Sequence, residues 1–427
     1  MNMIDTLSIR HYSIVKYFII SSLFATSIIS ISFIFYLPNL RLYIGYPIQF
    51  IMNSTLLIII FKYLHKKKQD MSNIGKFILI IWFIYINFHL LFGLRGNSIE
   101  LRNLFFTSWG IISLLLSGLL LLDYNFIIIT KLAHFVHHKI LPFGIIYITS
   151  VVIIRIMLGY NPFIYNTMCD FLVLSLISGL FGLYSQNTSF LKRAVIAIIL
   201  LIVYGFLTDE RHAIANAIIY FFAILITLIN LKKNKIKNTK FINLITFTFF
   251  VIAILFVFNL LTKENEIGKY VSGKIEALIY NREIIADTRS FAYSEVLDQL
   301  NISESIVGRG ILGRYYSDYV NQEYNIAGGR YLVEIGILWL ILKIGYLGAV
   351  LYLILNIFII KTAYNSRNSF TKGIGFVIIC RLILMSTEQI PIHDLRNIMF
   401  WILCGIVLSE NIREISDEEI IHSLRTN

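Results

Sequence analysis

The chain has few charged residues and few cysteines, the residues whose disulfide bonds stabilise small domains. Only 15% of its 427 residues are charged, whereas 57% are hydrophobic. This balance excludes an ordinary soluble globular protein. Its cysteines, Cys169, Cys380 and Cys404, lie far apart inside apolar segments. They therefore provide neither a metal-binding spacing nor a disulfide framework.

Several ligand-binding motifs are missing as well. The chain has no Gly-rich phosphate loop and no dinucleotide fingerprint, so neither ATP nor a nucleotide sugar is indicated as a ligand. Between its first two hydrophobic runs there is no Asp-x-Asp pair of the kind that holds a metal ion. The sequence therefore predicts no cofactor and no metal.

What the sequence does contain is a series of long apolar runs. Runs of about 18 or more apolar residues can cross the ~30 Å hydrocarbon core of a bilayer as helices. Because these runs are continuous and do not alternate, they favour helices over a transmembrane barrel. The first run is too long for a signal peptide and lacks a small-residue cleavage site. We expect helices over residues 13–36, 44–64, 75–93, 104–123, 141–159, 164–186, 193–208, 212–230, 241–262, 336–360, 373–389 and 396–410.

Clusters of lysine and arginine at the ends of these runs predict the orientation. If the chain crosses twelve times, the clusters at 65–68, 192–193, 232–235 and 361 all fall on one side. Cytoplasmic loops carry the excess of Lys and Arg, so both termini are predicted to be cytoplasmic. The net charge of +12 is then an orientation signal, and no nucleic acid partner is expected.

One long polar stretch, residues 263–332, interrupts the single transmembrane domain expected over residues 1–427. It is rich in arginine, acidic residues and tyrosine and is predicted to lie on the outer side. Apolar residues at helical spacing predict a short surface helix over Thr288–Leu300. After the loop, Tyr331–Gly345 and Tyr346–Ile360 together exceed one comfortable span. The first of these fits a re-entrant or interfacial segment.

Arginines gather on the predicted outer side. Arg211 lies in the tight turn Thr208–His212, and Arg289, Arg309 and Arg314 lie in the long loop. A guanidinium group is a planar, permanently charged fork that binds two phosphate oxygens at once. The cluster therefore suits a phosphate or pyrophosphate at headgroup depth. The alternative is that these side chains are solvated or pair with nearby acids.

Three charges fall inside or near predicted spans: Arg155, Asp170 and Arg381. A charge at the centre of a membrane helix costs about 2.5–3.5 kcal/mol on the translocon scale, so such residues are functional candidates. Arg155 and Asp170 lie toward the outer ends of their helices, where they can pair or reach the interface. Arg381 is nearer mid-membrane and is predicted to line a cavity for a lipid-linked substrate.

Two segments resemble a known family. The turn 207–213, Leu-Thr-Asp-Glu-Arg-His-Ala, followed by a long apolar helix, is similar to the arginine-bearing turn of O-antigen polymerases of the Wzy type and of the related O-antigen ligases. The segment 334–348 resembles the end of their long periplasmic loop. The spacing from Arg289 to Gly308-Arg309-Gly310 resembles the arginine-then-glycine arrangement of that loop. The resemblance covers roughly residues 200–410.

The resemblance implies a fold of the GT-C type and a metal-independent glycosyltransferase at the periplasmic face of a bacterial inner membrane. Its donor would be a glycan on polyprenyl pyrophosphate, such as undecaprenyl pyrophosphate, transferred onto a new lipid-linked repeat unit of O-antigen or capsule. Arg211 and Arg289 match the family's arginines and would neutralise the departing pyrophosphate. Arg309, Arg314 and Arg381 are further binding candidates. Implied partners are a chain-length regulator and a flippase.

The general base stays open. The His-Asn pair that many relatives carry near the end of the loop is missing, and Gly336 and Ile337 stand there instead. Three sites offer a proton acceptor for a sugar hydroxyl: Glu334, His212 and the His393-Asp394 pair. The alternative is that Glu334 pairs with Arg330 and that His393 caps the last helix.

Three functions also stay open, besides a polytopic protein with only structural or assembly duties. The leading hypothesis is a repeat-unit polymerase for a surface polysaccharide. An O-antigen ligase would transfer finished glycan to lipid A core, and the missing His-Asn pair counts against it. A lipid-linked oligosaccharide flippase typically shows two similar halves and short loops, whereas this chain shows neither.

Overall fold

The computed structural model is mainly helical in the part of the chain that it describes, where an isolated bridge between Tyr315 and Arg330 occurs but no β-strand. The described residues are 11–24, 46–63, 73–93, 112–158, 172, 174–208, 211–233, 292–310, 312–317, 329–330, 333, 335–386 and 394–426.

In addition to the two unlabelled helices over residues 11–24 and 292–298, the structure has the following elements in chain order. They are α3 (Tyr46–Tyr63), α4 (Asn73–Gly93), α6 (Ile112–Leu115), the 3₁₀-helix η3 (Leu116–Leu121), α7 (Phe126–Phe135), the π-helix η4 (Val136–Ile140), α8 (Leu141–Leu158), α10 (Ser175–Ser185), α11 (Thr188–Thr208), α12 (Arg211–Lys233), α15 (Ile302–Val307), α16 (Gly336–Tyr364), α17 (Ser369–Met385), α18 (Leu395–Leu408), α19 (Glu410–Arg413) and α20 (Asp417–Thr426).

Short polar side chains mark where several helices begin. Asn125, Asn368 and Asp394 each accept a hydrogen bond from the backbone N–H three residues later, at 2.9, 2.9 and 2.8 Å. Such N-caps satisfy backbone donors that have no partner inside the helix. The apolar runs therefore become helices with defined starts.

Large hydrophobic side chains are exposed in stripes at helical spacing. On α4 the exposed residues are Ile74, Phe77, Ile84, Phe88 and Leu91, with exposed fractions of 47–70%. In water, contiguous apolar surface of this kind marks an interaction site, and in a bilayer it contacts lipid. Among the residues that the structure describes, four helices are long and apolar enough to cross a membrane: Asn73–Leu91, Thr188–Gly205, Ala213–Leu231 and Gly336–Tyr364. The chain is an α-helical membrane protein.

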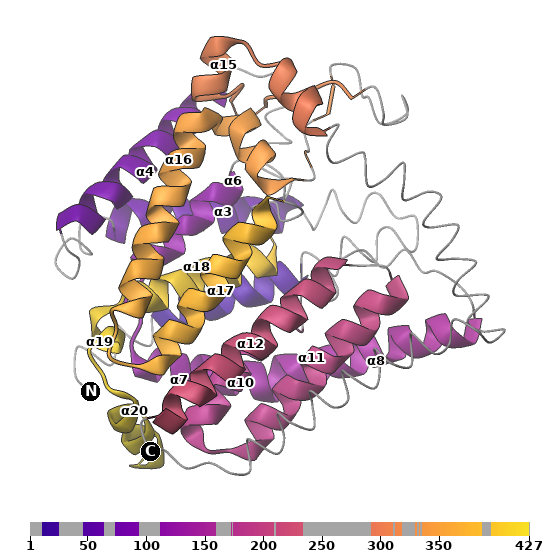
Figure 1. The fold of residues 1–427 in the computed structure, drawn as a ribbon, viewed down its shortest axis with the longest axis vertical. Helices are drawn as coiled ribbons and strands as arrows, with labels where there is room; N and C mark the ends of the chain where they lie inside the picture. Colours follow the sequence, from indigo (N-terminus) through magenta and orange to yellow (C-terminus); the bar gives the residue numbers. More distant parts are fainter. Residues whose placement is uncertain are drawn as a thin grey trace.

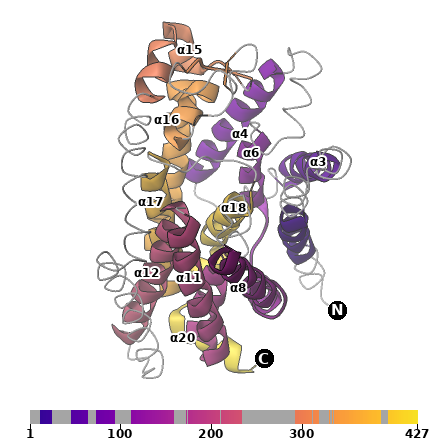
Figure 2. The ribbon, with the colours of Figure 1, turned by 90° about the vertical axis from the view of Figure 1, so that its right-hand side faces the viewer.

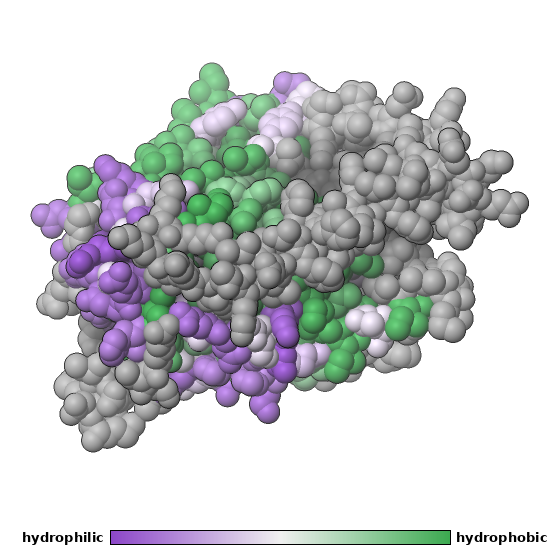
Figure 3. Space-filling model, turned by 60° about the horizontal axis from the view of Figure 1, so that its bottom comes forward, coloured by the Kyte–Doolittle hydropathy of each residue, from purple (hydrophilic) through white to green (hydrophobic). Residues whose placement is uncertain are grey.

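The helices form a bundle with two different ends (Figures 1 and 2). We call one the loop end; it carries residues 292–317 with α15 and lies at the top of Figure 1. We call the other the α20 end, because the C-terminal helix packs there. With the α20 end turned forward, hydrophilic residues gather over part of it and hydrophobic residues border them (Figure 3).

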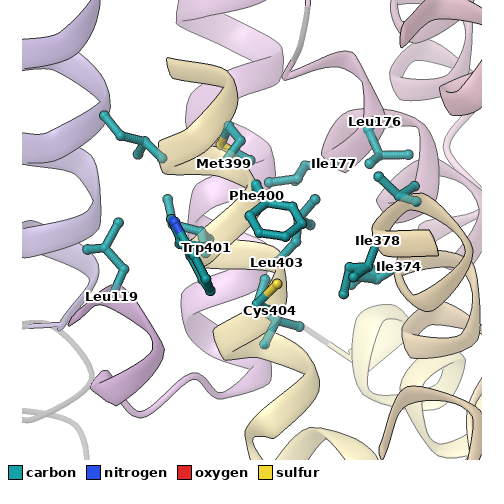
Figure 4. Packing of buried hydrophobic residues seen from close by; sticks show 14 of the residues in the cluster. Leu119, Leu176, Ile177, Ile374, Ile378, Met399, Phe400, Trp401, Leu403 and Cys404 are labelled. Atoms are coloured by element: carbon teal, nitrogen blue, oxygen red, sulfur yellow. The ribbon is translucent and has the colours of Figure 1, made fainter. Parts of the chain in front are cut away.

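Helix α18 lies in the middle of the bundle, with η3, α10, α16 and α17 around it (Figure 4). Every residue from Asn397 to Leu408 is buried, including Trp401 and Phe400. Gly405 allows a close approach, because a Cβ there would lie 2.4 Å from the ring of Tyr124. After Arg396 and Asn397 the helix is apolar on all sides, and this part of it is the core of the molecule.

Most of the predicted spans coincide with helices. The predictions over 44–64, 75–93, 141–159, 193–208, 212–230, 336–360, 373–389 and 396–410 match α3, α4, α8, α11, α12, α16, α17 and α18. The span over 241–262 lies outside the described residues, as do large parts of those over 13–36, 104–123 and 164–186. The surface helix predicted over Thr288–Leu300 is present over residues 292–298.

The span predicted over 141–159 matches α8, and the helix continues before it through α7 and η4. The chain is helical from Phe126 through Leu158, and no predicted span covers residues 126–140. Its buried face explains the difference. Leu132, Ala133 and Val136 pack into the core, and the ring of His137 stacks on Phe190 at 3.8 Å between centroids. Packing of this kind stabilises a helix that polarity alone does not predict.

Helix α16 is broken at Gly345, whose φ and ψ are 70° and 178°. Residues 338–344 before the break are buried on all sides, whereas Leu347, Val350 and Ile357 after it are about half exposed. Residues 346–364 alone extend about 28 Å at the helical rise of ~1.5 Å per residue, enough for one crossing. This agrees with the expectation that the apolar stretch before Tyr346 is a separate, inserted segment.

Candidate functional site

The predicted outer loop packs onto the break in α16. Gly308 and Gly345 both have positive φ, 82° and 70°, and their backbones touch. A Cβ on Gly345 would lie 2.2 Å from the carbonyl oxygen of Ile306, and one on Gly308 would lie 2.5 Å from the backbone of Lys343. Only glycine combines this backbone conformation with such a close approach. The pair therefore fixes the loop against the membrane helix.

The last carbonyl groups before the break find partners outside their own helix. Leu342 O accepts a 2.8 Å hydrogen bond from the Arg309 N–H, and Ile344 O accepts a 2.6 Å bond from the Tyr85 hydroxyl of α4. The buried ammonium of Lys343 donates to Gly313 O at 2.5 Å, and its charge interacts with that of Arg314. Carbonyls at a helix end need such partners. The loop, α4 and α16 consequently form one unit.

Arg309 holds this loop together. Its guanidinium donates to the carbonyl oxygens of Arg314, at 2.7 Å, and Gln299, and Nε lies 3.2 Å from the Glu304 carboxylate. Gln299 also exchanges two hydrogen bonds with the backbone of Tyr316. The guanidinium therefore has protein partners on several sides, as in the salt-bridge alternative for the outer arginines.

A second group of charges lies at the loop end of α17 and α18. We call Arg381, Asp394, Arg396 and Asn397 the arginine cluster. The Arg381 side chain is buried, with 8% exposed. It donates to Asn397 Oδ1 at 2.5 Å and to Arg396 O at 3.3 Å, and its guanidinium carbon lies 4.8 Å from the centre of the Phe400 ring. The side chain is thus held between an amide and an aromatic face.

Asp394 connects the two arginines of the cluster. It accepts hydrogen bonds from the backbone and side-chain amides of Asn397 at 2.8 and 2.9 Å. It also pairs with Arg396, whose Nε and second guanidinium nitrogen lie 2.9 and 2.8 Å from Oδ2. The cluster therefore contains two guanidinium groups and one carboxylate, and its net charge is positive.

The loop reaches the arginine cluster through its first described helix. The Tyr293 hydroxyl donates a 2.9 Å hydrogen bond to Ser386 O, just beyond the end of α17. Burial at this contact raises the pKa of Tyr293 above its ordinary value. Arg381 lies between one and two turns before Ser386 on the same helix. The contact therefore places residues 292–298 beside the end of the helix that carries Arg381.

The predicted site residues fall into three groups. Arg289, Glu334 and His393 lie outside the described residues, as does Asp170. Arg211 is the first residue of α12, followed by His212, and Arg155 lies in α8; nothing is described of these three side chains. The described candidates are Arg309 and Arg314 in the loop turn and Arg381 in the arginine cluster. Asp394, which belongs to the His393-Asp394 pair proposed as a general base, is a neighbour of Arg381 in that cluster.

Sequence reasoning missed Arg396, Asn397 and Lys343. The spacing of Asp394 and Asn397 is a helix-start signal, because an N-cap side chain bonds the N–H three residues later. Lys343 is a charge within an apolar run, the same feature that singled out Arg381. Its partner, Gly313 O, comes from a segment that no sequence pattern links to it.

Comparison of the whole chain with protein-family models, with curated proteins and with solved structures finds no match.

Proposed function

We propose that this protein is a repeat-unit polymerase for a surface polysaccharide, O-antigen or capsule. It transfers the growing glycan from polyprenyl pyrophosphate onto a new lipid-linked repeat unit, at the periplasmic face of a bacterial inner membrane. The proposal includes twelve crossings, cytoplasmic termini and a fold of the GT-C type. It rests on the resemblance of residues 200–410 together with the arginine cluster.

The single observation that carries the proposal is the buried Arg381 guanidinium. A permanent charge inside an apolar bundle is costly and is retained where it has a task. Here Asn397 and Phe400 hold it rigidly, Arg396 adds a second positive charge, and only Asp394 within the cluster offsets them. Held guanidinium groups at membrane depth suit a lipid-linked diphosphate.

The chemistry follows from this charge. The acceptor hydroxyl attacks the anomeric carbon of the donor sugar, the bond from that carbon to the diphosphate oxygen breaks, and the hydroxyl proton passes to a base. Negative charge then grows on the departing diphosphate. Positive groups fixed in advance at that position stabilise the transition state more than the ground state. Arg381 and Arg396 supply such groups, with Arg211 and Arg289 as the arginines matched by resemblance.

The test is the gel profile of surface polysaccharide from a strain that lacks the gene, complemented with wild type or with variants. A lost ladder with single repeat units retained supports the polymerase. Polymer that stays on its carrier, with none on lipid A, indicates the ligase, and complete loss of surface repeats indicates the flippase. Arg211→Ala and Arg289→Ala should each abolish the ladder and retain single repeat units. Normal ladders from both variants would overturn the diphosphate assignment.

A further inference from the structure

The continuous helix 126–158, at the α20 end, presents an unusual exposed stripe. Ile127 is 45% exposed, and Lys131, His134 and His138 follow it on the same side at steps of three and four residues. Phe143 and Ile146, 56% and 68% exposed, continue the stripe. Cationic and imidazole groups are therefore bordered on both sides by apolar side chains along one helix face.

The π-helix η4 keeps this stripe continuous. Its turn contains one extra residue, so the stripe passes from His138 to Phe143, with the exposed Lys139 beside it. Such turns within α-helices are frequently found at functional sites. Here the turn also tucks His137 inward, where its ring nitrogen Nε2 lies 3.3 Å from the Ser189 hydroxyl. The π-helix thus separates one buried imidazole from those on the surface.

The helices that form this face carry basic side chains but no acidic ones. Helices α7, η4, α8, α10 and α11 contain no Asp or Glu, and Asp123 lies three residues before α7 begins. Lys139 and Lys192 are exposed beside the stripe, and Arg193 donates to His137 O at 2.7 Å. The rings of His134 and His138 stack 5.8 Å apart. Burial and the neighbouring His138 lower the pKa of His134, so at neutral pH the lysines carry the charge.

We propose that this face, defined by Lys131, His134, His138 and Lys139, binds the headgroup of an anionic phospholipid. The lysines attract the phosphate, and the imidazole N–H groups donate hydrogen bonds to its oxygens. The flanking Ile127, Phe143 and Ile146 contact the acyl chains. The sequence of apolar and cationic side chains along this face fits a ligand with both an anionic and an apolar part. In a membrane protein, the ligand with that chemistry is a lipid.

The experiment measures lipid binding to the purified full-length chain by native mass spectrometry. The probes are phosphatidylglycerol and phosphatidylcholine with identical acyl chains. The variant is Lys131→Gln/Lys139→Gln, and the matched control is Lys361→Gln, an exposed lysine near the C-terminal end of α16. All three positions are on the surface, and thermal unfolding in the presence of phosphatidylcholine verifies that each variant folds.

Wild type and Lys361→Gln should prefer phosphatidylglycerol. The double variant should lose about fivefold of that preference for each lysine removed. Equal binding of the two lipids by wild type would overturn the proposal, as would an equal loss in Lys361→Gln. Displacement of phosphatidylglycerol by inorganic phosphate would also overturn it, since the site would then recognise phosphate alone.

Discussion

The two ends of the bundle treat buried polar groups differently. At the α20 end, the buried Asp417 accepts hydrogen bonds from the Tyr184 hydroxyl at 2.6 Å and from the backbone and hydroxyl of Ser369 at 2.7 Å each. Asn368 there donates to Ile412 O and Ile415 O. At the loop end, the arginine cluster carries two guanidinium groups and one carboxylate. Matched hydrogen bonds indicate a structural clamp at the α20 end, whereas under the proposed function the guanidinium groups of the arginine cluster bind the diphosphate.

The largest expected effect comes from a substitution at the loop end. Arg381→Gln should lower polymer formation about 10²–10³-fold, the usual cost of removing one fixed donor to a developing anion. Arg381→Lys should fail as well, because it loses the forked contact with Asn397 Oδ1 and Arg396 O. The measurement is polymerisation of lipid-linked repeat units by equal amounts of folded protein.

The matched control for Arg381 is Arg193→Gln, which removes a guanidinium at the other end that donates to His137 O. It should retain wild-type polymerisation. Wild-type rates from Arg381→Gln would show that the buried guanidinium only holds α17 to α18.

The next largest effect comes from a substitution at the α20 end. Asp417→Ala removes three hydrogen bonds from a buried carboxylate, so the free energy of unfolding should fall by about 2–4 kcal/mol. Activity per folded molecule should not change. Thermal unfolding in detergent measures the loss, and the exposed neighbour Glu418→Ala should change stability little. A fully folded Asp417→Ala with lost activity would contradict the assignment of this end as structural.

A smaller effect concerns the contact between loop and membrane helix. Gly345→Ala adds a Cβ 2.2 Å from Ile306 O to a residue with φ of 70°. Gly310→Ala meets a similar φ of 75° with no atom within 4 Å. The control should cost about 1–2 kcal/mol for the backbone alone, and Gly345→Ala should cost more. Equal losses, measured by thermal unfolding, would show that the loop does not depend on this contact.

The smallest effect is the pH response of α20. The exposed Glu419 carboxylate accepts hydrogen bonds from Ser416 N and Oγ at 2.7 and 2.8 Å, and these bonds lower its pKa below the ordinary 4.5. Its folded pKa is depressed, so its contribution is present above pH 4.5 and is lost as pH falls through the lower value. Hydrogen exchange at the start of α20 should speed up under acid, and in Glu419→Gln this acid response should be absent.

Much of the fold could be predicted because the hydrocarbon core of a bilayer restricts which segments can cross it. A helix that crosses hydrocarbon needs a minimum length of apolar residues, and α4, α11 and α12 satisfy this requirement plainly. The surface helix 292–298 and the inserted segment before Gly345 could also be predicted, because helical spacing and excess length are properties of the local sequence.

The site could be predicted only in part. Arg381 is recognisable from its position in an apolar run, but its partners Asn397 and Phe400 come from another helix. Lys343 and Gly313 are likewise joined by tertiary structure. The helix 126–140 lies outside the predicted spans because its histidines and lysines interrupt the apolar pattern, whereas Phe190, distant in sequence, gives His137 a packing partner.

The meeting of Gly308 with Gly345 has an evolutionary consequence. Since neither backbone leaves room for a methyl group on the other, neither glycine can be replaced by itself during evolution. A lineage that gains a side chain at one of them must lengthen or re-route the segment that faces it. Substitutions at these sites should therefore arrive together with insertions in the connection between residues 300 and 317, and rarely alone.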